Sequence, residues 1–205
     1  MSSVGLIDYG MGNLRSVANA LEGFGATVTV IKEARELSNF DRVVLPGVGA
    51  FGDAMANLNR AGWPEALAEH ALRRERPFLG ICLGMQLLAA RGTEHGQHSG
   101  LGWLAGEVRL LTRAPPHRIP HMGWNEVRAT NRTGLLRDLA ADATCYFVHS
   151  FAFVPEDQQL ITGVTEYGGV DFVSVVERGN VVATQFHPEK SQKHGLGLLA
   201  RFLQM

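Results

Sequence analysis

Short apolar runs alternate with amphipathic stretches through the first part of the chain. Apolar runs rich in β-branched residues predict strands, and apolar side chains three or four positions apart predict helices. The predicted strands are Val4–Asp8, Thr27–Ile31, Arg42–Leu45 and Pro77–Ile81. The predicted helices are Asn13–Phe24, Phe51–Ala61, Pro64–Arg74 and Leu83–Ala90. Strands that alternate with helices in this order predict a mostly parallel central sheet with helices on both faces.

Strand-like segments follow one another in the C-terminal half of the chain. They are Glu107–Leu111, Trp124–Val127, Thr144–Val148, Leu160–Val164, Phe172–Val176 and Val181–Gln185. Such a run predicts an antiparallel extension at the sheet edge or a small second sheet. A final helix is expected at Gly195–Leu203. Because the chain shows no linker and no internal repeat, we expect an α/β fold in a single domain that spans residues 1–205.

The composition is that of an ordinary globular protein, with 205 residues of which 45% are hydrophobic and 19% are charged. A net charge of −1 argues against a nucleic acid or an anionic membrane as partner. No apolar run reaches the roughly 18–20 residues that span a bilayer, and the first residues lack the basic and apolar regions of a signal peptide. The two cysteines form no CxxC pair, which argues against a disulfide framework or a zinc site. We expect a cytoplasmic protein with no metal and no cofactor.

The segment Gly80-Ile81-Cys82-Leu83-Gly84 lies between a predicted strand and a predicted helix. It has the form of a nucleophile elbow, with cysteine in place of serine. The backbone at the centre of such a turn is strained, and the small residues Gly80 and Gly84 leave room for it. The start of the helix also favours the reactive thiolate form of Cys82. Cys145 lies inside a predicted strand without flanking glycines, so we interpret it as a core residue.

His187 is the expected partner of this thiol. A thiolate nucleophile needs a group that moves protons, both during attack and for the leaving amine. His187 follows an apolar strand, as a residue at the carboxyl edge of a sheet would, and Glu189 comes two positions later. In an extended segment, residues i and i+2 point to the same side. Glu189 is therefore predicted to orient the His187 imidazole as the third member of a triad.

Two further segments are predicted to lie at the same edge of the sheet. Gly47 and Gly49 follow a strand directly, which allows backbone N–H groups to face a ligand. Together with the N–H of Leu83, this turn is a candidate oxyanion hole. His149-Ser150 also follows a strand, and from its spacing alone it either lines the site or forms an ordinary strand end.

Two other motifs are weighed and rejected. Asp8–Asn13 is glycine-rich between a strand and a helix, but the third glycine of a dinucleotide fingerprint is replaced by Arg15. We interpret this segment as a glycine turn with Asn13 as helix cap, and a partner-facing loop is the alternative. His117 and His121 are four positions apart, but the prolines around them forbid a helix, so a metal-binding pair is not expected.

Taken together, these segments resemble the class I, triad-type glutamine amidotransferases. More narrowly, they are similar to the glutaminase subunits of imidazole glycerol phosphate synthases, nearly from end to end. The shared segments are Asp8–Asn13, Leu45–Phe51, Gly80–Gln86, His121–Asn125, Tyr146–Phe151 and Gln185–Ser191. The cysteine elbow and His-Pro-Glu mark the wide family. The segments that point to the histidine-pathway branch are Pro46–Gly49, His121–Asn125 and His187–Ser191. One departure is Phe151, where that branch often carries tyrosine, although family contacts at this position use largely the backbone.

The resemblance implies a role for each site residue. Cys82 attacks the side-chain amide carbon of glutamine, His187 moves protons and Glu189 orients His187. A thioester forms, ammonia leaves, and water releases glutamate. The residues whose backbone is implied to stabilise the oxyanion are Gly47, Val48, Gly49 and Leu83. The implied substrate-binding residues are Gln86, Ser150 and Phe151.

The resemblance also implies a partner. The family docks a separate cyclase subunit, a (β/α)8 barrel, over the site as a heterodimer and passes the ammonia to it. The products are imidazole glycerol phosphate and an aminoimidazole carboxamide ribotide, in histidine biosynthesis. Apolar and glycine-rich loops at the strand ends are expected to contact the cyclase. The expected interface residues are Tyr9, Met11, Asn13, Met122 and Trp124.

Two alternatives stay open at the level of sequence. The glutaminase could serve another pathway, such as aromatic amino-acid or nucleotide synthesis, although those branches should lack the His121–Asn125 segment. The chain could instead be a regulatory or scaffold module without turnover, although no member of the triad is missing.

Overall fold

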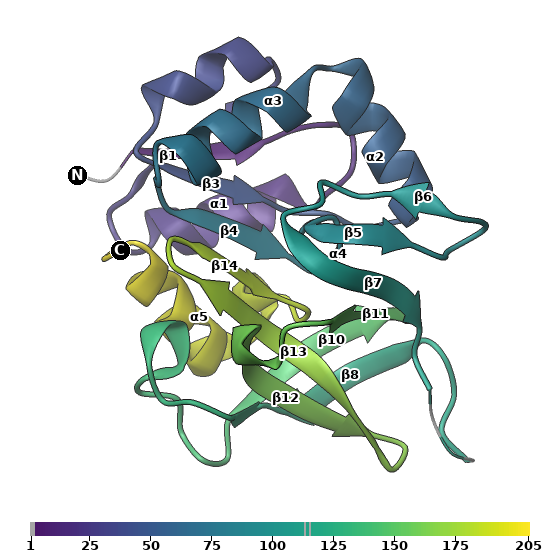
Figure 1. Ribbon diagram of the computed structural model, residues 1–205. Helices are drawn as coiled ribbons and strands as arrows, with labels where there is room; N and C mark the ends of the chain where they lie inside the picture. Colours follow the sequence, from purple (N-terminus) through teal and green to yellow (C-terminus); the bar gives the residue numbers. More distant parts are fainter. Residues whose placement is uncertain (1–2, 113, 115) are drawn as a thin grey trace.

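The computed structural model describes residues 3–112, 114 and 116–205, and its main element is an eight-stranded sheet (Figure 1). In spatial order the strands are β2 (Thr27–Ile31), β1 (Ser3–Ile7), β3 (Arg42–Leu45), β4 (Phe78–Ile81), β14 (Val181–Thr184), β13 (Val170–Arg178), β12 (Ile161–Tyr167) and β9 (Arg128–Ala129). The strands from β2 to β14 pair in parallel, and β13, β12 and β9 extend the sheet by antiparallel pairing. The predicted fold class is confirmed.

Helices cover both faces of the parallel part of the sheet (Figure 1). The helices are α1 (Leu14–Glu22) and α5 (Gln192–Phe202) on one face and α2 (Phe51–Arg60) and α3 (Trp63–Ala68) on the other. Side chains alternate along a strand, so Val43 and Leu45 of β3 join the core under α2 and α3 while Val44 joins the opposite core. Burial on both faces is why these strands read as continuous apolar runs. None of the helices in the described part of the chain is long and apolar enough to cross a membrane.

Two smaller sheets pack beside the large one. The first pairs β8 (His121–Glu126) with β10 (Thr144–His149), and the second has the order β11 (Phe151–Pro155), β7 (Leu104–Leu110), β5 (Ala89–Gly92) and β6 (His98–Ser99). The second half of the chain therefore contains both an antiparallel edge extension and separate small sheets, which were the two predicted outcomes. Because β10 leads directly into β11, the strand-end segment His149-Ser150 joins the two small sheets.

The predicted helix Leu83–Ala90 is wrong in its second half. Helix α4 covers only Leu83–Gln86, and Ala89 already begins β5. The carbonyl groups of Leu87 and Leu88 accept hydrogen bonds from N–H groups of the segment 101–104, which lies across from them. These long-range partners replace the helical ones, so a tertiary contact ends the helix. The predicted helix Pro64–Arg74 likewise continues from α3 into a π-helical turn, η2, at Glu69–Arg73.

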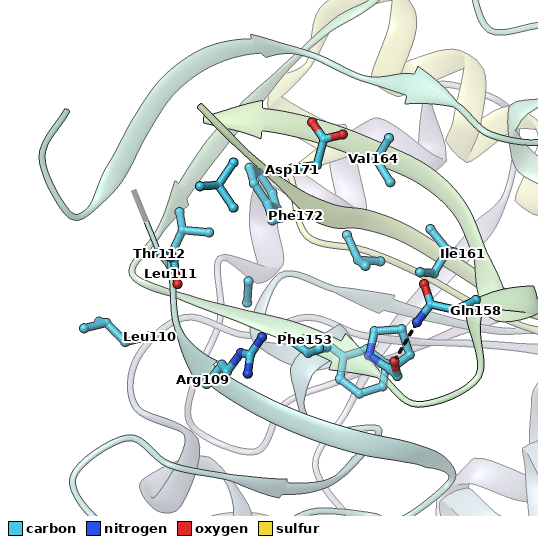
Figure 2. A pocket seen from close by; sticks show the side chains of 15 residues that line it. Arg109, Leu110, Leu111, Thr112, Phe153, Gln158, Ile161, Val164, Asp171 and Phe172 are labelled. Carbon is cyan, nitrogen blue, oxygen red and sulfur yellow. Dashed lines mark hydrogen bonds between the residues drawn. The ribbon is translucent and has the colours of Figure 1, made fainter. Parts of the chain in front are cut away.

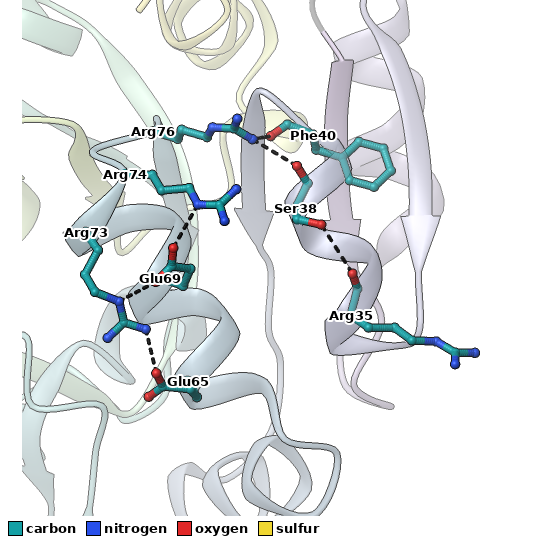
Figure 3. A network of polar contacts seen from close by, with 8 residues as sticks. All are labelled: Arg35, Ser38, Phe40, Glu65, Glu69, Arg73, Arg74 and Arg76. Atoms are coloured by element: carbon teal, nitrogen blue, oxygen red, sulfur yellow. Dashed lines mark hydrogen bonds and ion pairs between the residues drawn. The ribbon is translucent and has the colours of Figure 1, made fainter.

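Arg73 and Arg74, at the end of η2, are exposed to solvent. Glu69 accepts hydrogen bonds from Arg73 and from Arg74, with the Arg74 contact at 2.8 Å (Figure 3). Such exposed ion pairs contribute little to stability. Arg76 differs, because its guanidinium donates a 2.8 Å hydrogen bond to the carbonyl oxygen of Phe40 and so ties η2 to the segment that precedes β3 (Figure 3).

Candidate active site

Cys82 occupies the sharp turn between β4 and α4. Its backbone angles are φ 55° and ψ −107°, which a residue with a side chain rarely adopts. A Cβ atom on Gly80 would lie 2.7 Å from the carbonyl oxygen of Gly84, and one on Gly84 would lie 1.9 Å from the carbonyl oxygen of Leu45. Both flanking positions must therefore be glycine. The geometry is that of the predicted nucleophile elbow, with the Cys82 side chain buried.

The sheet brings His187 to the same place. Strand β14 runs parallel to β4, with Thr184 opposite Ile81, and the N–H of Cys82 donates a 2.7 Å hydrogen bond to the carbonyl of Thr184. The chain leaves β14 beside the elbow, and the N–H of His187 is held by the carbonyl oxygen of Tyr146 on β10 at 2.9 Å. The Cys82 thiol and the His187 imidazole thus lie at the carboxyl ends of neighbouring strands, where sites of α/β sheets form.

Glu189 contacts the imidazole as predicted, but the backbone between the two residues is not extended. The carboxylate oxygen Oε1 of Glu189 lies 2.8 Å from Nδ1 of His187, and the two side chains are 1% and 3% exposed. The segment Pro188–Lys190 forms a single 3₁₀ turn, η5, which begins directly after His187. The contact therefore comes from a tight turn that folds Glu189 back under the ring. A carboxylate at Nδ1 leaves Nε2 as the free ring position.

The environment of His187 favours its protonated form. Burial lowers its pKa, but the neighbouring Cys82 and Glu189 raise the pKa by more than burial lowers it, and the net effect is a pKa of about 9. The Nε2 atom is buried and has no hydrogen-bond partner at ordinary distance among the described residues, and the interaction of the ring with Cys82 is the first of the causes that raise its pKa. His187 is therefore placed to hold a proton close to the sulfur.

A cavity of about 460 Å³ opens over the Cys82 sulfur. Its walls include residues that sequence analysis assigned to two different roles. The predicted site residues that line it are Val48, Gly49, Leu83, Gln86, Ser150 and Phe151. Gly47 lies just behind, since a Cβ atom on it would come within 2.8 Å of the Leu83 side chain and 2.4 Å of the Tyr9 hydroxyl oxygen. The turn after β3 and the elbow therefore touch, as an oxyanion hole built from both requires.

Glu94 also lines this cavity, and sequence analysis did not identify it. Its Oε2 atom accepts a 2.9 Å hydrogen bond from the N–H of Phe51, at the start of α2. This bond fixes a carboxylate in the wall of the cavity, which Ser150 also lines. Glu94 lies in a loop between β5 and β6 with no motif around it, so only the tertiary structure reveals it.

Three buried groups form a hydrogen-bonded chain to the sulfur. Nε2 of Gln86 donates to the carbonyl oxygen of Phe151 at 2.8 Å and to Oε1 of Gln185 at 3.0 Å. Nε2 of Gln185 in turn donates to the Cys82 sulfur at 3.6 Å. Gln185 is a second residue that sequence analysis did not place in the site. The available signal is its position, because it is a polar residue directly after an apolar strand and two positions before His187.

A pair of histidines extends this network. Nδ1 of His149 lies 2.9 Å from the carbonyl oxygen of Phe151, and Nδ1 of His121 lies 3.1 Å from Nε2 of His149. Because the carbonyl can only accept, His149 must carry its proton on Nδ1 and His121 must donate from its own Nδ1. Burial lowers the pKa of His149 to about 3 and that of His121 to about 4, which keeps both rings neutral near pH 7. The described residues contain no cluster that could hold a metal ion.

The residues expected to face a partner differ in exposure. Met122 and Trp124, on β8, are 62% and 48% exposed. Asn13 is exposed and Met11 is half-buried, whereas Tyr9 is buried beneath Gly47. The strand predicted to begin at Trp124 begins at His121, so Met122 lies on a strand and not in a loop. Asn13 is the N-cap residue of α1, as predicted, although its side chain makes no cap hydrogen bond.

A second cavity, of about 260 Å³, lies between β7, β11, β12 and β13 (Figure 2). Figure 2 shows mainly apolar side chains around it, with Arg109 and Asp171 at its rim. It shares no lining residue with the cavity over Cys82, and its lining contains no cysteine or histidine. This cavity therefore offers a ligand neither a thiol nor an imidazole.

Comparison with solved structures gives the same architecture. A crystal structure described as a glutamine amidotransferase superimposes with a TM-score of 0.75 at 18% identity, covering 98% of this chain and 99% of that one. The structure of PurLQS from Thermotoga maritima gives a TM-score of 0.74 at 21% identity, covering 99% and 95%. At these identities the likeness concerns the fold alone.

Comparison of sequences identifies the family. The model of the family described as "Glutamine amidotransferase class-I" matches residues 5–205. The imidazole glycerol phosphate synthase subunit HisH of Aquifex aeolicus is 51% identical over 198 residues, which cover 96% of this chain and 94% of the relative. The HisH subunit of Zymomonas mobilis is 48% identical, covering 98% and 95%. The chain therefore belongs to the class-I glutamine amidotransferase family and, within it, to the HisH subunits of imidazole glycerol phosphate synthase.

Proposed function

We propose that this chain hydrolyses glutamine to glutamate and ammonia and passes the ammonia to a cyclase subunit in histidine biosynthesis. The observation that carries the proposal is the arrangement of Cys82, His187 and Glu189: a strained elbow cysteine, an imidazole beside it and a carboxylate 2.8 Å from that imidazole. The relatives named HisH support the pathway.

The reaction has two halves. The Cys82 thiolate attacks the side-chain amide carbon of glutamine, and the carbonyl π electrons move to oxygen. Collapse of this tetrahedral intermediate breaks the C–N bond, and the leaving nitrogen takes a proton from His187 and departs as ammonia. Water then adds to the thioester and gives a proton to His187. The C–S bond breaks, its electron pair returns to sulfur, and glutamate leaves. Glu189 keeps the imidazole oriented throughout.

The walls of the cavity fit the charges of the substrate. The oxyanion is assigned to backbone N–H groups of the turn Gly47–Gly49 and of Leu83, where loss of one donor typically costs about 100–1000-fold in rate. Glu94 offers a fixed carboxylate to the α-ammonium group of glutamine. The amide of Gln86 and the backbone at Ser150 and Phe151 hold the remaining polar groups of the substrate.

The partner is assigned as a separate (β/α)8-barrel cyclase that covers the cavity mouth. The exposed pair Met122 and Trp124 supports this docking surface, because aromatic and methionine side chains are enriched at interfaces. Met11 and Asn13 are assigned to the same surface. The products of the complex are imidazole glycerol phosphate and an aminoimidazole carboxamide ribotide. A cytoplasmic location is proposed from the two free cysteines, Cys82 and Cys145.

The test is glutamate release from glutamine by the purified chain, alone and with the cyclase subunit and a nucleotide ligand of the cyclase. Strong stimulation by the partner that disappears in Cys82→Ala is the expected result. High activity of the chain alone, unchanged by the cyclase, would support the proposed glutaminase activity but overturn the proposed pathway. Absence of activity in every condition would favour a regulatory module over an enzyme.

A further inference from the structure

A fully buried amide stands at the reacting sulfur. The side chain of Gln185 has no solvent exposure, and its Nε2 atom lies 3.6 Å from the Cys82 sulfur. The two residues are 103 positions apart and meet because β14 and β4 are neighbours. The backbone of Gln185 is held as well, since its N–H donates a 2.9 Å hydrogen bond to the carbonyl of Ser174 on β13. The amide is therefore a fixed part of the sheet edge.

The orientation of this amide follows from its neighbours. The carbonyl oxygen of Phe151 only accepts hydrogen bonds, so the group of Gln86 that faces it at 2.8 Å must be the NH₂ group. The same NH₂ group lies 3.0 Å from the Gln185 amide, which must then present its oxygen. The Gln185 NH₂ group is left facing the sulfur. Reversal of either amide would place two donors or two acceptors against each other, which is costly in a buried site.

We propose that Gln185 is a further catalytic residue, which donates an N–H hydrogen bond to the Cys82 sulfur whenever that sulfur carries negative charge. This inference rests on the proposed function, in which Cys82 is the nucleophile. Charge sits on sulfur before attack on the amide carbon, and again when the C–S bond of the thioester breaks and its electron pair returns to sulfur. Hydrogen bonds to a charged acceptor are about twice as strong as neutral ones, so the donor favours both thiolate states.

The other polar groups around the sulfur act differently. His187 moves a proton and can supply a positive charge only while it is protonated. Tyr9 is buried nearby, and its hydroxyl makes no hydrogen bond to the described residues. Gln185 does not titrate, so its donor is present at every pH and at every step of the reaction. Gln185 therefore offers the sulfur the same hydrogen-bond donor throughout, whereas the charge of His187 changes during the reaction.

The direct test measures how fast iodoacetamide alkylates Cys82 as a function of pH, with the Cys82-containing peptide followed by mass spectrometry. Gln185→Met has a similar length but neither donor nor strong acceptor. Over the part of the pH range in which the rate still rises with pH, its alkylation should be about tenfold slower than that of the wild type. Ser174→Ala is the matched control, because it removes a fully buried hydroxyl next to Gln185 without touching the sulfur. This control should alkylate at the wild-type rate and pH.

A second variant, Gln185→Glu, distinguishes hydrogen-bond donation by residue 185 from a role in packing alone. It also provides the test if Gln185→Met does not fold. A protonated carboxyl can donate O–H to the sulfur, whereas an ionised one cannot. A buried carboxyl beside a thiolate keeps its proton to a higher pH than an exposed one, so in complex with the cyclase the glutaminase rate of this variant relative to wild type should fall as pH rises from about 6 to about 8. A constant ratio over this range, or a wild-type alkylation profile in Gln185→Met, would overturn the inference. Failure of the wild-type complex to release glutamate would instead overturn the proposed function.

Discussion

The main-chain N–H of Cys82 donates a 2.7 Å hydrogen bond to the carbonyl oxygen of Thr184. This bond is the last rung between β4 and β14, and it lies between the nucleophile and the strand that leads to His187. The spacing of sulfur and imidazole is therefore set by a sheet ladder. Sites built on regular elements are held more precisely than sites on loops.

The backbone strain at Cys82 predicts that glycine at this position gives a more stable protein than alanine, the reverse of the usual order. Cys82→Ala and Cys82→Gly should both lose glutamine hydrolysis. Because a side chain at φ 55° and ψ −107° costs free energy that glycine avoids, the glycine variant should be the more stable one by about 1 kcal/mol. Urea unfolding of both variants measures this difference. A more stable alanine variant would show that the elbow is relaxed.

Two glycines of α5 predict opposite effects of the same substitution. A Cβ atom on Gly195 would lie 2.1 Å from the carbonyl oxygen of Pro188, so Gly195→Ala should push η5 away, destabilise the chain by about 2 kcal/mol and slow glutaminase turnover. Gly197 has its nearest neighbour, a guanidinium nitrogen of Arg201, at 3.6 Å. Gly197→Ala should stabilise the helix by about 0.5–1 kcal/mol with normal turnover. Thermal unfolding and glutamate release check both, and equal effects would contradict the close packing of η5 against α5.

The titration of His187 should depend on both of its neighbours. Its pKa rises from the ordinary 6.5 to about 9 in the folded chain, through Cys82 and Glu189 and against burial. A raised pKa of this kind adds stability that is complete below about pH 6.5 and is lost as pH rises through about 9. In Glu189→Gln the pKa should fall, and the loss of stability over this window should shrink. NMR titration of the imidazole with urea unfolding at several pH values measures both, and an unchanged titration would refute the coupling.

Glu94 should act on substrate binding and leave the nucleophile alone. Glu94→Gln removes the charge but keeps an oxygen that can accept the N–H of Phe51. KM for glutamine should rise about tenfold, since one charge-assisted hydrogen bond is lost, while the rate of Cys82 alkylation by iodoacetamide stays normal. Steady-state kinetics in the cyclase complex measures the first quantity. A normal KM for glutamine would show that the Glu94 carboxylate does not bind the substrate.

The exposed side chains of β8 should carry binding energy for the partner. Met122→Ala and Trp124→Ala should each weaken the complex by about tenfold or more, because large side chains at interface centres dominate affinity. Phe24, which is 46% exposed just beyond α1, provides the control, and Phe24→Ala should bind normally. Titration calorimetry with the cyclase subunit measures all three. Equal affinities for all three variants would show that Met122 and Trp124 are not part of the interface.

The parts of the site that the sequence predicts are those whose geometry is local. The glycine spacing around Cys82 reflects clashes within a few residues and with one neighbouring strand, and His187 with Glu189 forms a contact two positions long. Both are readable from spacing. The 3₁₀ turn at Pro188–Lys190 is not predictable in this way, because an i, i+2 contact fits an extended or a folded backbone equally well.

Features set by distant segments escape prediction. Glu94 enters the cavity because its loop lies over the start of α2, and Gln185 meets the sulfur because β14 lies beside β4. The end of α4 at Gln86 has the same cause, since the carbonyls that follow it pair with the segment 101–104. Apolar periodicity contains no information about such pairings. The parallel order of the first strands is predictable because alternating strands and helices leave few other topologies.

The carbonyl oxygen of Phe151 receives both Gln86 and His149, and it thereby dictates the polarity of every bond from the histidine pair to the sulfur. A main-chain oxygen is the same whatever side chain its residue carries. Exchange of Phe151 for tyrosine would therefore leave this acceptor unchanged. The group that orients the side chains of this site is a main-chain oxygen, which a side-chain substitution at position 151 does not remove.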